Sequence, residues 1–186
     1  MILLALAVLA FIAVHLIAAM PAAKASLRAR LGKAYGPGFG GASLVTLALL
    51  VLAWRAREWV PVYEPPIWGN YATFTLVLIA FLFLGTWIFR GSWRQSIRFP
   101  LALATIFWGF GHLFVRGDVA SLILFGGIIA FGAAYLALGL AQGMRPTPEV
   151  RKGHNLLGIL FGLAFYGVFT QLHAVLIGVP VLTLTN

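Results

Sequence analysis

The sequence predicts an all-α fold, a polytopic bundle of about six transmembrane helices. Apolar residues make up 62% of the chain and charged residues only 9%, against about 25% charged residues in typical globular proteins. The mean hydropathy is +1.00. The apolar residues gather in stretches close to the roughly 20 residues that cross a bilayer. This pattern excludes a soluble domain, a disordered chain and a nucleic-acid-binding protein.

The 186 residues suit one domain, which we place at residues 1–186. Six apolar stretches within it qualify as helices, and no charged side chain lies deep inside any of them. Their expected bounds are residues 2–20, 39–56, 71–89, 99–115, 119–141 and 155–179.

The first stretch is expected to be a retained helix rather than a cleaved signal peptide. A signal peptide carries basic residues before its apolar run, whereas here the basic residues Lys24, Arg28, Arg30 and Lys33 follow it. The glycine-rich segment 36–41 lacks the lysine and the preceding strand of a phosphate-binding loop. We therefore interpret it as a flexible start of the second helix.

The remaining stretches are bounded by turn and cap signals. A proline-rich and tryptophan-containing segment, residues 61–68, is typical of an interfacial loop before the third helix. The fourth stretch is short and uncharged. It is followed by the turn Arg116-Gly117-Asp118, in which Asp118 can cap the fifth helix. In the sixth helix, the glycines of GILFG at 158–162 form a plausible packing face.

The distribution of basic residues predicts the orientation in the membrane. The first, third and fifth connections carry ten of the 13 Lys and Arg residues, and the second and fourth carry three. By the positive-inside rule the odd connections face the cytoplasm. Both termini are therefore expected on the periplasmic side of a bacterial inner membrane.

Histidines are the candidates for chemistry, because the spans lack the buried charges of proton pumps and the paired carboxylates of acid–base enzymes. The chain also has no cysteine. His15 lies late in the first helix, His112 lies between small residues in the fourth, and His173 lies late in the sixth. His154 falls in a basic turn and is expected to be a surface or headgroup residue.

Two interpretations of the intramembrane histidines stay open. Neutral imidazole is a common metal ligand, so His15 and His112 on separate helices could hold a b-type haem, with basic residues at the cytoplasmic side meeting its propionates. Helix rise places them about 8 and about 18 Å from the cytoplasmic ends, an offset that helix tilt would have to absorb. The alternative is a set of interhelical hydrogen bonds, each worth roughly 1 kcal/mol.

Several sequence blocks resemble the NnrU family of bacterial membrane proteins over nearly the whole chain. They are RARLG at 28–32 after His15, RFP at 98–100, WGFGHL at 108–113, GDVASLILFG at 117–126 and LHAVLIGVP at 172–180. The family usually has a histidine where this chain has Phe99. The family is named for an association with nitrite and nitric oxide reduction, and it is similar to the haem-b zeta-carotene isomerases of plants and cyanobacteria.

The resemblance implies haem b with ligands at the positions of His15 and His112, and His173 of the terminal block as a third cofactor-binding candidate. It implies a redox role, a role linked to nitric oxide or denitrification, or cis–trans isomerisation of an apolar polyene such as a carotenoid. The missing histidine at position 99 argues against a role that needs it, and a shared fold does not transfer activity.

Two other classes of function remain. The chain could be a cofactor-free assembly or maturation partner of respiratory or denitrification complexes in the bilayer, with its histidines serving only in packing. A small transporter or channel is disfavoured, because buried charge and inverted repeats are missing. Bound haem distinguishes the first alternative from the haem protein.

Overall fold

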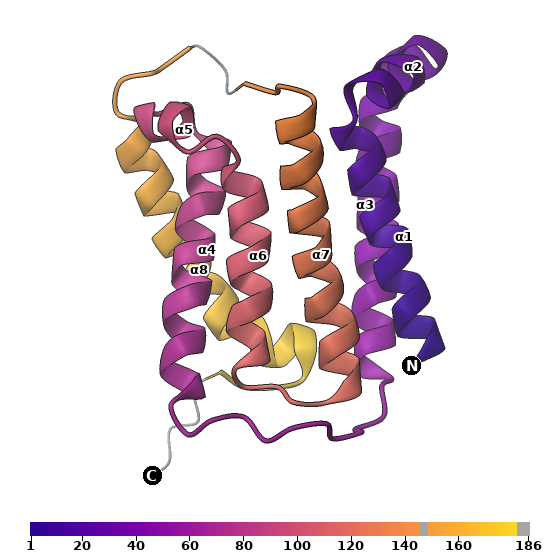
Figure 1. The fold of residues 1–186 in the computed structure, drawn as a ribbon, viewed down its shortest axis with the longest axis vertical. Helices are drawn as coiled ribbons and strands as arrows, with labels where there is room; N and C mark the ends of the chain where they lie inside the picture. Colours follow the sequence, from indigo (N-terminus) through magenta and orange to yellow (C-terminus); the bar gives the residue numbers. More distant parts are fainter. Residues whose placement is uncertain (146–148, 182–186) are drawn as a thin grey trace.

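The computed structural model describes residues 1–145 and 149–181, and its helices confirm the predicted all-α class (Figure 1). The C-terminus, expected on the periplasmic side, lies outside the described residues. The six apolar helices coincide closely with the expected stretches. They are α1 (Ile2–Ala19), α3 (Tyr35–Arg55), α4 (Gly69–Ile88), α6 (Pro100–Leu113), α7 (Val119–Ala141) and α8 (His154–Ile177).

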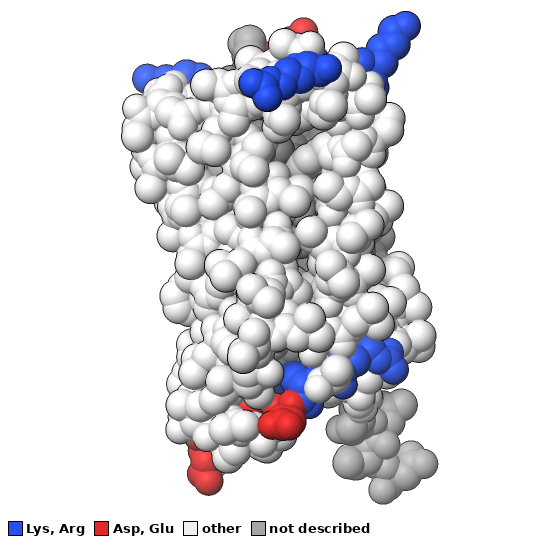
Figure 2. All heavy atoms as spheres, turned by 90° about the vertical axis from the view of Figure 1, so that its right-hand side faces the viewer, with Lys and Arg blue, Asp and Glu red and all other residues white. Residues whose placement is uncertain are grey.

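Four helical segments within the described residues are long and apolar enough to cross a membrane: Pro21–Arg55, α4, α7 and α8. Helices α1 and α6 are shorter apolar helices beside them. Figure 2 shows one face of the bundle, on which charged atoms gather at the two ends and leave a broad uncharged band between them. The protein is therefore a multi-pass membrane protein.

Neighbouring helices pack in the order α3, α1, α7, α6, α4 and α8. Helix α8 breaks this simple row because it begins beside α4 and runs obliquely behind α6 (Figure 1). Its last turn reaches α3, where Arg55 Nη1 donates to the carbonyls of Val175 at 3.0 Å and Leu176 at 3.3 Å. The oblique course carries the end of α8 across the bundle.

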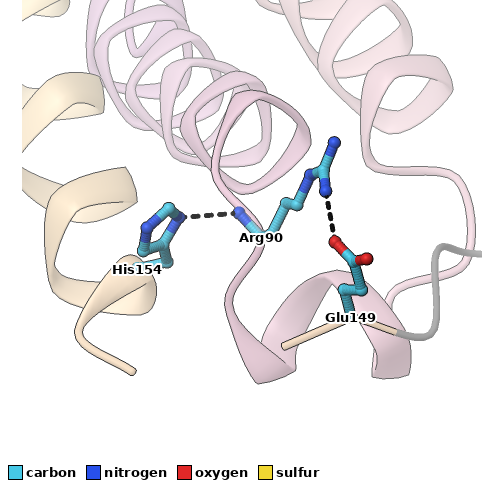
Figure 3. A network of polar contacts seen from close by, with 3 residues as sticks. All are labelled: Arg90, Glu149 and His154. Atoms are coloured by element: carbon cyan, nitrogen blue, oxygen red, sulfur yellow. Dashed lines mark hydrogen bonds and ion pairs between the residues drawn. The ribbon is translucent and has the colours of Figure 1, made fainter. Parts of the chain in front are cut away.

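One end of the bundle, here called the basic end, carries the connections 20–34 and 89–99 and the described residues 142–145 and 149–153. It also holds the helix α2 (Pro21–Leu31), a 3₁₀ turn η1 (Gly32–Ala34) and the short helix α5 (Ser92–Ser96). At this end His154 Nδ1 accepts the backbone N–H of Arg90 at 3.2 Å, and Arg90 pairs with Glu149 at 2.6 Å (Figure 3). His154 thus joins the start of α8 to the end of α4.

The opposite end, here called the strap end, is crossed by residues 56–68. This strap pairs with the turn before α7, where the N–H groups of Val62 and Tyr63 donate to the carbonyl of Gly117 at 2.7 and 3.0 Å. Asp118 caps α7 as predicted, because its Oδ1 accepts the backbone N–H of Ser121 at 3.1 Å. The main buried core lies next to this end, between α1, α3 and α7.

Candidate functional site

His112 lies one residue before the end of α6, toward the strap end. Its ring packs against Trp108, with centroids 4.5 Å apart, and against Phe125 of α7, with centroids 4.6 Å apart and planes at 20°. The rings of Trp108 and Phe125 also contact each other, with centroids 5.1 Å apart. Gly109 makes this close approach possible, because a Cβ there would lie 2.9 Å from the carbonyl oxygen of Phe125. The small residue that the sequence places beside His112 therefore brings α7 against its ring.

His173 of α8 is the histidine that the structure brings to His112. The two ring centroids are 6.5 Å apart and the ring planes differ by 18°. Two imidazoles that bind one metal ion from opposite sides, with metal–nitrogen bonds of about 2 Å, have ring centres roughly 6 Å apart. The separation of His112 and His173 is therefore compatible with a shared metal.

Backbone carbonyls fix the tautomers of both rings. The Nδ1–H of His112 donates to the carbonyl of Trp108 at 2.8 Å, and that of His173 donates to the carbonyl of Val179 at 2.6 Å. The second bond depends on Gly178, whose φ of 81° turns the chain back at the end of α8. Because a carbonyl only accepts, Nδ1 carries the hydrogen in each ring, and in the neutral form of imidazole the lone pair is then on Nε2, as in metal-ligating histidines.

His15 lies in a separate aromatic cluster nearer the basic end. Its ring contacts Phe11, Phe39 and Phe131, with centroids 4.1, 5.8 and 6.1 Å away, and its Nδ1–H donates to the carbonyl of Phe11 at 2.7 Å. The residues of α7 that touch His15 and His112, Phe131 and Phe125, are six positions apart, or about 9 Å along the helix. The structure thus pairs His112 with His173 and holds His15 at another level.

A basic group and an indole N–H donor lie beside Phe125 at the strap end, on the way from His112 to the strap. The guanidinium of Arg57 lies 3.8 Å from the ring of Trp54, which in turn contacts Phe125. Burial and the neighbouring charge of Arg116 lower the pKa of Arg57, and Asp118 opposes the shift. Two buried donors here, Trp54 Nε1 and Arg57 Nε, have no partner within the described residues. These donors fit an acidic group.

An apolar groove of about 280 Å³ lies in the uncharged part of the bundle. Trp108, whose ring also packs against His112, forms part of its wall. The full lining is Ala80, Phe81, Leu84, Leu101, Ala104, Thr105, Trp108, Ile128, Phe165 and Phe169. Sequence reasoning missed this groove, because its residues come from four helices and none carries a distinctive motif.

The donor set around His112 and His173 limits what they can hold. Residues 1–145 and 149–181 contain no cluster of three or more potential metal-ligating side chains. Two imidazoles alone would hold a bare metal ion weakly. A metal that brings its own ligands, as haem iron brings four porphyrin nitrogens, needs no more than two from the protein.

The comparisons with known proteins identify the family. No curated protein and no solved structure matches the chain. The NnrU protein family matches residues 3–181. Since this match covers nearly the whole sequence, the chain belongs to the NnrU family.

Proposed function

We propose that this NnrU family protein is a membrane haem-b protein whose iron ligands are His112 and His173. The 6.5 Å separation of the two imidazole centroids, with each Nδ1–H on a backbone carbonyl, is the observation that supports this proposal. The proposal keeps His112 from the sequence analysis and replaces His15 with His173 as its partner. The buried donors Trp54 Nε1 and Arg57 Nε are suited to the two propionates.

The surroundings of the histidine pair support chemistry on an apolar substrate. Trp108 and Phe125 give the ring of His112 an apolar, aromatic surrounding. The groove beside Trp108 offers a long apolar molecule a place in the uncharged part of the bundle. Haem bound here would supply one-electron transfer and, with one imidazole released, a coordination position for nitric oxide or for a double bond.

His173 is the ligand better placed to leave. It lies near the end of α8, a helix with few buried residues, and the Gly178 turn holds its ring. His112 instead packs against two aromatic rings in the bundle. The site has an apolar groove and one ligand that can be released. These features favour isomerisation of a polyene over electron transfer alone.

The test is an absorption spectrum of the protein purified in mild detergent from haem-replete cells, oxidised and then reduced with dithionite, with haem quantified. We expect a stoichiometric b-type spectrum that is lost or altered in His112→Ala and His173→Ala. The matched variant His15→Ala removes an intramembrane imidazole at another level and is expected to keep the spectrum.

Two outcomes would contradict the proposal in different ways. Loss of the spectrum in His15→Ala but not in His173→Ala would establish the pairing of His15 with His112 instead. A folded protein without haem would exclude the haem function and favour an assembly partner of respiratory or denitrification complexes. If haem binds, conversion of cis-polyenes and nitric oxide binding are the next measurements.

A further inference from the structure

A second cavity lies at the basic end, between the ends of α4, α6 and α7, and has a volume of about 150 Å³. Three arginines from three different segments converge on it: Arg94 of α5, Arg98 before α6 and Arg145 after α7. The full lining is Trp87, Arg94, Arg98, Phe99, Pro100, Leu101, Tyr135, Met144 and Arg145. None of these residues is acidic.

The positive charge in this cavity has no carboxylate to neutralise it. The chain has only four acidic residues, and Glu58, Glu64 and Asp118 belong to the strap end. The fourth, Glu149, pairs with Arg90 at 2.6 Å (Figure 3). Three arginines that line one cavity, with no carboxylate among the lining residues, favour the binding of an anion there.

Arg94 and Arg98 are half-buried where they line the cavity, and Arg145 is exposed. Arg98 is fixed by donation from its Nε to the carbonyl of Met144 at 2.7 Å, and its guanidinium lies 5.2 Å from the ring of Phe99. Arg94 is partly buried, and its pKa is lowered by this burial and by Arg90, while Tyr135 opposes the shift. The cavity thus holds a partly desolvated positive charge against aromatic walls.

The size and position of the cavity indicate the chemistry of the ligand. A cavity of about 150 Å³ has room for a phosphate group. Guanidinium groups bind phosphate oxygens through paired, charge-assisted hydrogen bonds. Trp87 at the end of α4 is typical of the membrane–water interface, where lipid phosphates lie.

We propose that Arg94, Arg98 and Arg145 form a binding site for a phosphate group at the basic end of the bundle. The interfacial position makes the headgroup of an anionic phospholipid the expected source, and free phosphate ion is the other source of the same chemistry. The site is at the opposite end from His112 and His173. It is therefore independent of the proposed haem function.

The experiment uses the full chain, purified in a non-ionic detergent and depleted of lipid. Thermal unfolding and equilibrium binding are measured with phosphatidylglycerol, with phosphatidylcholine as the zwitterionic control, and with inorganic phosphate against chloride. The test variant is Arg94→Gln/Arg145→Gln, which leaves the hydrogen bond of Arg98 in place. The control is Arg30→Gln/Lys33→Gln, which removes the same charge from exposed positions at the same end.

We expect phosphatidylglycerol, but not phosphatidylcholine, to raise the unfolding temperature. The test variant should weaken binding by at least about tenfold, because it removes charge-assisted hydrogen bonds, and the control variant by less than about twofold. Binding of inorganic phosphate with the same response to the variants would support the site with the free ion as its source. Binding of neither, or equal losses in the two variants, would overturn the proposal.

Discussion

Asp118 is completely buried, and its carboxylate organises the turn between α6 and α7. Its Oδ1 accepts the N–H of Ser121 in the first turn of α7, and its Oδ2 accepts the Ser121 hydroxyl. A carboxylate at this position also interacts favourably with the positive end of the helix dipole. The sequence predicts this cap from the turn chemistry alone.

Replacing Asp118 with alanine leaves the N–H of Ser121 without its acceptor in a buried turn. We expect Asp118→Ala to lower the free energy of unfolding by about 1–2 kcal/mol, seen as a lower unfolding temperature in detergent. Glu64→Ala removes an exposed carboxylate of the strap and is the control. Equal unfolding temperatures for Asp118→Ala and the wild type would contradict the capping role.

Tyr63 makes the strap sensitive to high pH. Its hydroxyl donates to the carbonyl of Leu113 and to that of Arg116 at 2.9 Å. Burial raises its pKa above the ordinary value of 10.0, and the charge of Asp118 adds to this rise. Because the folded protein then keeps a proton that the unfolded chain releases, stability is lost as the pH rises above about 10.

We therefore expect the difference in stability between the wild type and Tyr63→Phe to become smaller as the pH rises. At about pH 9 the wild type should be more stable than Tyr63→Phe by roughly 1 kcal/mol, and by about pH 11 this advantage should shrink. Thermal unfolding across this range measures it. Tyr71→Phe changes a tyrosine that is 77% exposed and should keep a constant offset from the wild type. A constant offset for Tyr63→Phe as well would refute the role of this hydroxyl.

At the scale of the helices, the sequence predicts where the apolar elements lie, because bilayer crossing imposes a length and a composition that are visible locally. It does not predict how they pair. The contact between His112 and His173 depends on the oblique course of α8, which no local pattern encodes. The arginine cavity likewise brings together residues that are far apart in the sequence, from the end of α4, from α5, from the start of α6 and from α7 and the residues after it.

The crossing of α4 and α8 is set by glycines on both helices. The sequence pattern indicates Gly158 and Gly162 as a packing face, and the structure confirms it, with Gly85 of α4 as the partner that the pattern could not identify. A Cβ at Gly85 would lie 2.0 Å from the carbonyl oxygen of Gly158, and one at Gly162 would lie 2.8 Å from that of Phe81. The two backbones are therefore in direct contact.

We expect Gly85→Ala to force α8 away from α4 and to lower the free energy of unfolding by roughly 1–3 kcal/mol. If the protein binds haem as proposed, the same shift should alter its spectrum through His173. Gly167→Ala is the matched control, because a Cβ there has no neighbour within 4 Å, and it should be neutral or slightly stabilising. If Gly85→Ala had the same free energy of unfolding as the wild type, the backbones of α4 and α8 would not be in contact.

At the scale of the whole molecule, the fold sorts the charges to its two ends. The helical bundle brings the first, third and fifth connections together at the basic end, including α2 and α5 (Figure 1). The sequence places ten of the 13 Lys and Arg residues in these connections. The phosphate site proposed above and the histidine pair consequently lie toward opposite ends of the bundle.

The positive-inside rule places the basic end in the cytoplasm, and the lack of cysteine in the chain makes this directly testable. Glu64→Cys puts a thiol in the exposed strap, and Lys33→Cys puts one at the basic end. A membrane-impermeant maleimide should label Glu64→Cys in intact cells and Lys33→Cys only after the membrane is disrupted. The reverse pattern would establish the opposite orientation in the membrane. The histidine pair would then lie toward the cytoplasm and the arginine cavity at the outer leaflet.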